Sequence, residues 1–446
     1  MTKKPMIICT VSALAFLSAC SGSASAPKGS GVVIAAQAKV PEKTADQDKD
    51  SYPESQAYFT HAEEKWKLSE ASQPLQKSVY PFYQKTMAAF LKDAKGENRV
   101  YSPLNVYIAL GMLAECTDND TRKQLLDVLS VNDVTTLRRV IDSAWSANWN
   151  DDKVLTLKMA NSAWMRNDFK YHQELMDRLA ETYHASAYSG EMGTDEMNKA
   201  LQDWLNENTN HLLEESVKNQ KTKKDTVLAL ASTLYLKGTW ASKFVKELTK
   251  DETFHAPDKD MTVPMMHKDE HGQVYFGNGW KAVSIYVTDC GYMWIFLPDE
   301  GVDPASLAND PEIYELLKGN LDAVDSKNGI VKLALPKFDV SSEISLIEEL
   351  KKLGVTSVFD FNSADFTPLT DDSDELAVSS IQHAARVKTD EEGVEAAAFT
   401  VIMVAEGAML VQPEIIDFRC DRPFLFALTG QDSSVLFTGI VNQPAE

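Results

Sequence analysis

The feature that most constrains the fold is a continuous apolar run, TVLALASTLYLKGTW, from Thr226 to Trp240. Apolar and small residues fill most of it, and Lys237 is its only charged residue. A strand with one solvated face alternates polar and apolar residues, whereas a run without alternation is typical of a strand covered on both faces. The chain is therefore predicted to build a sheet with further layers packed on each side.

The remaining patterns place helices early and strands late. Helical spacing begins near Leu75, and a second amphipathic helix follows Pro103, whose fixed φ suits a first helical turn. GYMWIFLP and VKLALPKFDV are predicted strands, and the chain closes with a predicted hairpin across Gly430 to Asp432. This order favours the α+β class with large sheets.

The first twenty residues predict an export signal rather than part of the fold. Lys3 and Lys4 precede an apolar stretch that is too short to span a membrane. The tetrapeptide ending at Cys20 resembles a lipobox, whose cysteine is acylated and becomes the mature N-terminus; an ordinary signal peptide cleaved nearby is the alternative. We expect an extracytoplasmic protein, lipid-anchored to a bacterial membrane at the cell surface or in the periplasm.

Composition divides the chain into three parts. Residues 1–20 are the predicted lipoprotein signal peptide, and residues 21–74 are a predicted flexible tether and N-terminal extension, rich in Ser, Gly, Ala, Lys and Asp at its start. Residues 75–446 form the predicted folded domain, which is large but within reach of a single α/β-type domain. The net charge of -22 argues against a nucleic-acid partner, because phosphates would be repelled.

Motifs for metals, cofactors and catalysis are absent from the sequence. Cys116, Cys290 and Cys420 are widely spaced and give neither a disulfide framework nor zinc spacing. His267 and His271 are four apart, but their polar segment is predicted to be a solvated loop rather than a metal site. There is no GxSxG, HExxH, P-loop or GxGxxG, so no cofactor is expected and the protein is predicted not to be an enzyme; a hydrolase with a divergent nucleophile is the alternative.

Several motifs, in order along the chain, resemble the serpin family. They are NRVYSPLNVYIALGMLAECTDNDTRKQLLDVL, ALASTLYLKGTW followed by FHA and VPMM, LALPKF, SSIQHAARVKTDEEGVEAAA, FRCDRPFLF and LFTGIVNQP. The resemblance covers about Leu75 to Pro444. It implies the serpin fold, with three β-sheets, eight to nine helices and an exposed reactive-centre loop near the C-terminus, in a monomer.

The resemblance also implies an activity, the suicide inhibition of serine proteases. A protease cleaves the loop and is held as an acyl-enzyme while the loop inserts into the main sheet as a new strand. The implied partner is therefore a serine protease in a covalent complex. The alternative is a non-inhibitory serpin acting as a binding module, because Phe399 is bulkier than the residue the family usually has there.

The family's hinge pattern of two acids, a glycine and small residues matches one segment of this chain: Glu391, Glu392, Gly393, Val394, Glu395, Ala396, Ala397 and Ala398. In an inserted strand, alternate residues face opposite sides. The face that begins at Val394 carries no charge until Glu406, so it can be buried without an unpaired ion. Gly393 suits the bend where insertion begins.

Residues outside the loop are carried over from the family individually. Trp240 matches the tryptophan of the breach, where insertion starts, and Lys337 matches a lysine that often pairs with the hinge acid, here Glu391. Ser102 and His383 match the shutter, which governs opening of the sheet. Ser232 stands where the family usually has Asn, so the shutter network is expected to differ or to recruit water.

The scissile bond is predicted at Gly407-Ala408 by counting forward from the hinge, although counting back from FRCDRPF ends near Gln412. The window from Val404 to Gln412 has no Arg or Lys, which excludes trypsin-like specificity. The small and apolar residues suit elastase-like or chymotrypsin- and subtilisin-like pockets. The residues predicted to set specificity are Val404, Ala405, Glu406, Met409 and Leu410.

Overall fold

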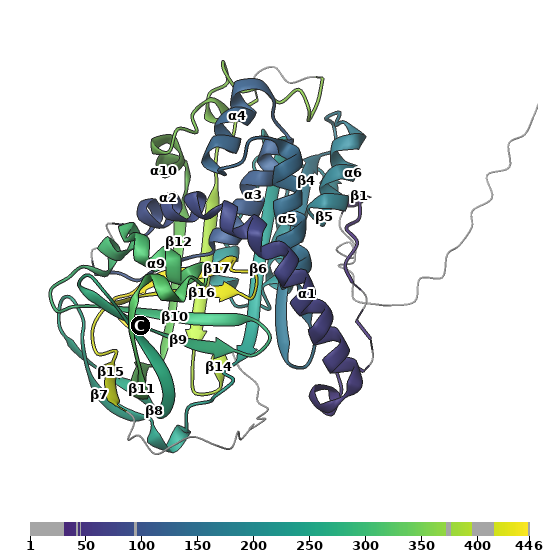
Figure 1. The fold of residues 1–446 in the computed structure, drawn as a ribbon. Coiled ribbons are helices and arrows are strands. Elements are labelled where there is room, and N and C mark those ends of the chain that lie inside the picture. Colours follow the sequence, from purple (N-terminus) through teal and green to yellow (C-terminus); the bar gives the residue numbers. More distant parts are fainter. Residues whose placement is uncertain are drawn as a thin grey trace, which may run out of the picture.

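The computed structural model describes residues 31–41, 43–44, 46–92, 96–371, 376–394 and 414–444. Helices gather around one long sheet, and a second, strongly bent sheet crosses in front of its lower part in the view of Figure 1. Together they form an α+β fold, as predicted.

The first sheet, which we call sheet A, has the strand order β1-β5-β4-β6-β14-β13-β12, with β3 paired to β4. The strands are β1 (Val33–Ala36), β3 (Asn150–Asp151), β4 (Leu155–Arg166), β5 (Ala185–Gly190), β6 (Leu228–Thr239), β12 (Phe338–Ser345), β13 (Gln382–Thr389) and β14 (Gly393–Val394).

The second sheet, sheet B, has the order β15-β11-β8-β9-β10-β16-β17-β2, with β7 paired to β8. Its strands are β2 (Arg99–Tyr101), β7 (Lys250–His255), β8 (Asp260–Gly277), β9 (Trp280–Val287), β10 (Gly291–Pro298), β11 (Asp325–Pro336), β15 (Ile415–Arg419), β16 (Phe424–Gly430) and β17 (Val435–Val441). Three sheets were expected; hydrogen bonding joins the described strands into two, because β8 pairs with β7 and β11 and continues into a pairing with β9. The predicted hairpin is confirmed as β16 and β17.

The described residues contain ten α-helices, at least one more than the eight or nine expected. They are α1 (Gln56–Ser78), α2 (Tyr80–Phe90), α3 (Pro103–Glu115), α4 (Asn119–Val128), α5 (Val134–Asn148), α6 (Gln173–Thr182), α7 (Asp195–Asn208), α8 (Glu214–Val217), α9 (Pro311–Leu317) and α10 (Ile347–Lys352). As predicted, α3 begins at Pro103, and the Ser102 hydroxyl caps it by accepting a hydrogen bond from the Asn105 amide at 3.2 Å.

Helices cover sheet A on both faces, as the apolar run predicted. Leu234 and Leu236 of β6 belong to the main core, on the side of α3, which contacts both β6 and β17. Ala229 and Ala231 of the same strand pack against a second, smaller core that includes Trp164 and residues of α7. Alternate residues of one strand therefore enter two different cores.

The N-terminal extension differs from the prediction. Residues 21–74 were expected to be a flexible tether, but within them β1 pairs with β5 and α1 packs along α5 (Figure 1). Helix α1 begins at Gln56, well before Leu75, where the periodicity predicted the first helix. Because the buried residues of α1 are Ser69, Ser72 and Gln76, an apolar pattern could not reveal it.

The segment around His267 and His271 also differs from the prediction, since it lies within strand β8 and not in a loop. His267 pairs with Ala334 and His271 with Ile330 across to β11. The His267 Nε2 atom is 2.9 Å from the Glu252 carboxylate. The part of the chain that the structure describes holds no cluster of three or more His, Cys, Asp or Glu side chains suited to a metal, and no described helix is both long and apolar enough to cross a membrane.

Candidate functional site

The centre of sheet A has a position open to one more strand, which we call the slot. Strand β6 pairs with β4 along one edge, and on its other edge the described part of the chain pairs with it through β14 alone, at Gly238 and Thr239. Strand β13 pairs with β12 along its length and with β14 only through Thr389. Among the described residues no ladder joins β6 directly to β13. Within the ranges that the structure describes, the facing edges of these two strands are joined by no strand beyond β14.

The hinge has already entered the end of the slot by two residues. Gly393 and Val394 pair antiparallel with β6, and Val394 also pairs with Thr389 of β13. Val394 is only 5% exposed and belongs to the main core. A Cβ atom on Gly393 would lie 2.2 Å from the carbonyl oxygen of Gly238, so only glycine fits at this position.

The end of the slot that holds Gly393 and Val394 is its mouth. Glu391 is fixed there by buried contacts. Its carboxylate lies 2.9 Å from the Lys337 ammonium group and accepts a hydrogen bond from the Thr249 hydroxyl at 2.8 Å. Burial raises the pKa of Glu391, but the hydrogen bonds from Lys337 and Thr249 outweigh it and hold the pKa below its ordinary value. Glu391 is therefore a charged anchor.

Glu392 is held by two lysines that the sequence analysis missed. Lys243 donates to its carboxylate at 2.8 Å and Lys246 lies 3.1 Å away. These hydrogen bonds lower the pKa of Glu392. These lysines are far from Glu392 in the sequence, so no sequence pattern could have predicted that they contact it.

Trp240 completes the mouth of the slot from the end of β6. Its indole N–H donates to the Asp390 carbonyl at 2.8 Å, and its backbone N–H donates to the Glu392 carbonyl at 3.0 Å. The Phe244 amide donates to the Glu391 carbonyl at 3.1 Å. The segment after β6 thus cradles the chain directly before Gly393.

Beneath the slot, Ser102 and His383 lie in contact. The Ser102 amide donates to His383 Nε2 at 3.0 Å, and the Ser102 hydroxyl donates to the Leu436 carbonyl at 2.5 Å. Asn105 donates to the Ser232 hydroxyl at 3.0 Å. Ser232 of β6 therefore accepts a side-chain hydrogen bond from Asn105 of α3, at a position where the family usually has asparagine.

We expect His383 to make stability pH-dependent. Burial lowers its pKa to about 4, from an ordinary value of 6.5, so the unfolded chain binds a proton that the folded chain refuses. The contribution of His383 to the free energy of unfolding should be fully present above about pH 6.5. It should fall by ~1.4 kcal/mol per pH unit as the pH drops towards 4. Thermal unfolding of the wild type and His383→Gln across this range tests it: the variant should show the shallower dependence, and equal slopes would contradict the assignment.

Part of the predicted site lies outside the described residues. This holds for Glu395 to Ala398 of the hinge, for the predicted bond Gly407-Ala408, for the specificity window from Val404 to Leu410, and for the lipidation residue Cys20. Of the predicted residues that are described, Trp240, Lys337, Glu391, Glu392, Gly393 and Val394 meet at one end of the slot, and Ser102 and His383 lie beneath it.

The described cysteines do not supply a nucleophile. Cys116, Cys290 and Cys420 are free and buried. Burial raises the pKa of the Cys116 thiol to about 12 and raises the other two as well, so all three stay protonated near neutral pH.

This arrangement, in which β14 of the hinge lies between β6 and β13 at one end of a large sheet, is matched by one protein family. Residues 79–444 match the family model described as Serpin (serine protease inhibitor). The chain belongs to the serpin family, as the motifs predicted. Members of this family are mostly protease inhibitors rather than enzymes.

Relatives and solved structures agree with this assignment. Serpin-Z10 of Arabidopsis thaliana is 30% identical over 369 residues, which cover 79% of this chain and 93% of the relative. Serine protease inhibitor 88Ea of Drosophila melanogaster is 29% identical over 380 residues, covering 79% and 87%. The native structure of Tengpin, a thermophilic serpin, shares the fold, with a TM-score of 0.71 and 22% identity over 83% of this chain and 94% of that one.

Proposed function

We propose that this protein inhibits serine proteases by a suicide mechanism in which the cleaved loop enters the slot. The observation that supports this most directly is the seated hinge, because Gly393 and Val394 already pair within the slot while, among the described residues, no ladder joins β6 to β13 beyond them. Cleavage would free the rest of the loop to continue from this starting point. The family's usual activity gives the proposal its second support.

Each described residue of the mouth has a part in this mechanism. The anchored acids Glu391 and Glu392 keep the chain before Gly393 in place while the residues after it move. The facing edges of β6 and β13 supply backbone donors and acceptors on both sides of the entering strand. The acyl-enzyme stays attached to that strand, so insertion carries the protease away and distorts its active site before water releases it.

The target is proposed from the loop sequence. Elastase-like proteases fit the small residues Val404, Ala405 and Ala408, and chymotrypsin- or subtilisin-like proteases fit Met409 and Leu410. Trypsin-like proteases find no Arg or Lys from Val404 to Gln412. We further propose that the protein is exported and lipid-anchored at Cys20 to a bacterial membrane, on the strength of the N-terminal signal.

Incubation with elastase, chymotrypsin, subtilisin and trypsin tests the function. We expect an SDS-stable covalent band with at least one of the first three and none with trypsin. Mass spectrometry of the released C-terminal peptide would identify the bond. Cleavage without a covalent complex across the whole panel would contradict inhibition and favour the non-inhibitory alternative, a binding module.

A further inference from the structure

Residues 31–78 precede the part of the chain that matches the serpin family model, yet the structure folds them onto the domain. We propose that β1 and residues 46–78 form an intramolecular strap that ties sheet A to sheet B beside the mouth of the slot and slows the entry of a strand. The inference rests on the proposed function in one respect, since the strand in question is the reactive-centre loop.

The strap first attaches to the outer strands of sheet A. In β1, Val33 pairs with Ser189 and Ala36 with Ala187, so β1 extends the sheet beyond β5. Val32, next to it, is 7% exposed and packs into the small core beneath α7. The attachment therefore combines backbone pairing with apolar burial.

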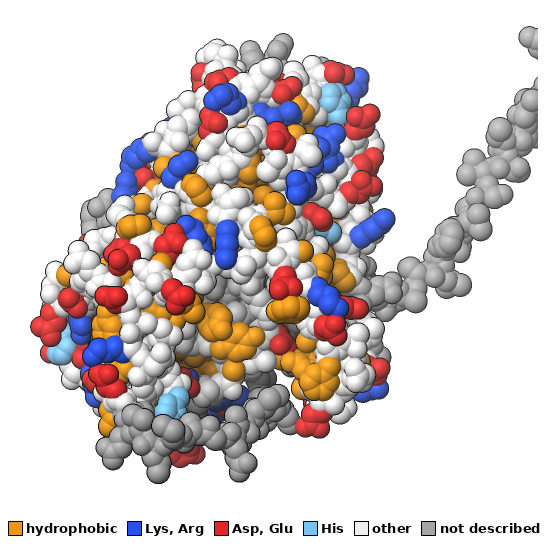
Figure 2. Space-filling view, viewed as in Figure 1, with side chains coloured by type: hydrophobic (Ala, Val, Ile, Leu, Met, Phe, Trp, Pro, Cys, Tyr) orange, Lys and Arg blue, Asp and Glu red, His pale blue; other side chains and the backbone are white. Residues whose placement is uncertain are grey.

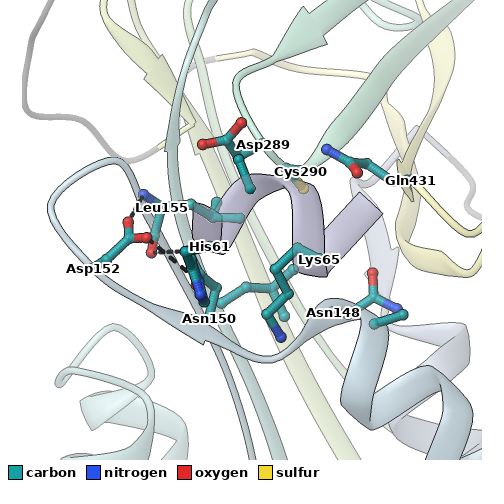
Figure 3. A pocket seen from close by; sticks show the side chains of 12 residues that line it. His61, Lys65, Asn148, Asn150, Asp152, Leu155, Asp289, Cys290 and Gln431 are labelled. Atoms are coloured by element: carbon teal, nitrogen blue, oxygen red, sulfur yellow. Dashed lines mark hydrogen bonds and ion pairs between the residues drawn. The ribbon is translucent and has the colours of Figure 1, made fainter. Parts of the chain in front are cut away.

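The strap next attaches to the β3–β4 hairpin. The Gln47 carbonyl accepts from the Lys153 amide at 2.9 Å, and His61 Nε2 lies 2.8 Å from the Asn150 side-chain oxygen. Lys65 donates to the Ser146 and Trp149 carbonyls at 2.8 and 2.5 Å, at the end of α5. Figure 3 shows His61 and Lys65 projecting from α1 towards this side.

The same helix attaches to two turns of sheet B. The Tyr58 side chain faces Asp289, which lies between β9 and β10, and burial together with the nearby Asp289 carboxylate raises the pKa of Tyr58. The Ser72 hydroxyl donates to the buried carboxylate of Asp432, between β16 and β17, at 2.8 Å. Asp289, Cys290 and Gln431 lie across a small cavity from His61 and Lys65 (Figure 3), which at about 20 Å³ has room for roughly one water molecule. Helix α1 thus bridges the two sheets. We call this junction, where α1 meets the β3–β4 hairpin and the turns at Asp289 and Asp432, the seam.

This seam is directly beside the mouth of the slot. Leu155, which lines the cavity, pairs with Gly238 of β6, and Gly238 pairs with the hinge residue Val394. From the other side, the Thr288 amide next to Asp289 donates to the Thr239 carbonyl at 2.9 Å. Both elements that the strap joins are therefore bonded to the end of β6, so a shift of β6 relative to sheet B strains the strap.

The seam is polar and largely buried, which makes its bonds costly to break. Burial raises the pKa of the Asp289 carboxyl and lowers the pKa of Lys65 to about 8. A buried polar group that loses its partner pays its full desolvation penalty. The strap therefore holds firmly while every partner is present and weakens sharply when one is removed.

The exposed side of α1 offers matched controls. Phe59 and Trp66 are each 54% exposed on the helix that carries Tyr58 and Ser72. In Figure 2, apolar side chains are seen on the surface of this region. Substitution of Trp66 alters the same helix without touching a polar contact of the strap, whereas the Phe59 ring lies 5.4 Å from that of Tyr58, so Phe59→Ala removes that packing and leaves the Tyr58 hydroxyl in place.

The test uses the full chain with the double variant Tyr58→Phe and Ser72→Ala, which removes the hydroxyl that faces Asp289 and the hydrogen bond to Asp432 and keeps the apolar shape. On warming below the melting temperature, the intact loop should enter the slot and become resistant to cleavage about tenfold faster than in the wild type, as expected for a barrier lowered by the loss of these two polar contacts. Phe59→Ala and Trp66→Ala should leave the rate unchanged. A double variant with the wild-type rate would overturn the proposal.

An engineered, reducible disulfide between β1 and β5 provides an independent test of the strap. Val33→Cys with Ser189→Cys places thiols on paired residues of β1 and β5, where a disulfide can form, and the native cysteines among the described residues, Cys116, Cys290 and Cys420, are buried. The oxidised protein should resist entry of the intact loop longer than the reduced one. Equal rates in the two redox states would mean that detachment of β1 plays no part.

Hydrogen exchange separates failure of the strap from failure of the proposed function. Amides of the β3–β4 hairpin and of β6 should exchange faster in the double variant than in either control, whether or not a protease is trapped. Faster exchange with no covalent complex for any protease would support the strap and refute inhibition. A covalent complex with unchanged exchange would support inhibition and refute the strap.

Discussion

Replacing Val394 with arginine is expected to turn the protein from a trap for its protease into a substrate of it. Val394 is 5% exposed between β6 and β13, and its neighbours there are backbone and the main core. No acidic side chain lies on the strand positions paired with it, which are Gly238 and Thr389. An arginine would enter the sheet as an unpaired charge, at a cost of several kcal/mol.

Because Val394 is already seated in the intact protein, the arginine is expected to expel the hinge there, so the cost is met when the cleaved loop inserts, whereas the cleavage site lies farther along the loop and is still read by the protease. Insertion would slow by ~100-fold or more, and hydrolysis of the acyl-enzyme would overtake it. The measurement is the stoichiometry of inhibition, the number of inhibitor molecules consumed for each protease trapped. We expect it to rise steeply while the rate of loop cleavage stays near that of the wild type.

Val245→Arg provides the matched control, since Val245 is 49% exposed in the segment that cradles the hinge. It adds the same charge near the mouth without burying it, so inhibition should be retained. Ala396→Arg, on the same predicted face as Val394, should behave as Val394→Arg does. Undiminished inhibition by Val394→Arg would refute the assignment of this face to the core.

The parts of the site that the sequence predicted are those encoded locally or by a motif. The acid-acid-Gly pattern at Glu391 marked the hinge, and the run ending at Trp240 marked the strand beside it. Alternation assigned Val394 to the face that the structure buries. Each of these rests on neighbours in the chain or on spacing that a strand imposes.

Contacts between distant segments could not be predicted in the same way. Lys243 and Lys246 meet Glu392 only because the chain returns to the end of β6 after nearly 150 residues. Helix α1 escaped detection because it docks through serine, glutamine, histidine and lysine side chains, which carry no apolar period. The β8 segment around His267 was predicted to be a loop for a related reason, since polar residues on the outer face of a strand resemble those of a loop.

Cleavage of the reactive-centre loop is expected to raise the melting temperature, and the slot explains why. Strands β6 and β13 are twelve and eight residues long, and only their ends are paired with β14. An inserted strand would satisfy backbone groups along both edges, adding on the order of ten hydrogen bonds that contribute about 1 kcal/mol each. The apolar side chains of the inserted face would be buried as well.

For a domain of this size, a gain on the order of 10 kcal/mol corresponds to a rise in melting temperature of more than about 10 °C. The measurement is a thermal scan of the native protein and of the protein nicked in the loop by a protease that it does not trap. The matched control is the nicked Val394→Arg variant, in which insertion is blocked, so its melting temperature should rise little. A nicked wild type that melts with the intact protein would mean that the cleaved loop stays outside the sheet, and the slot would then need another occupant.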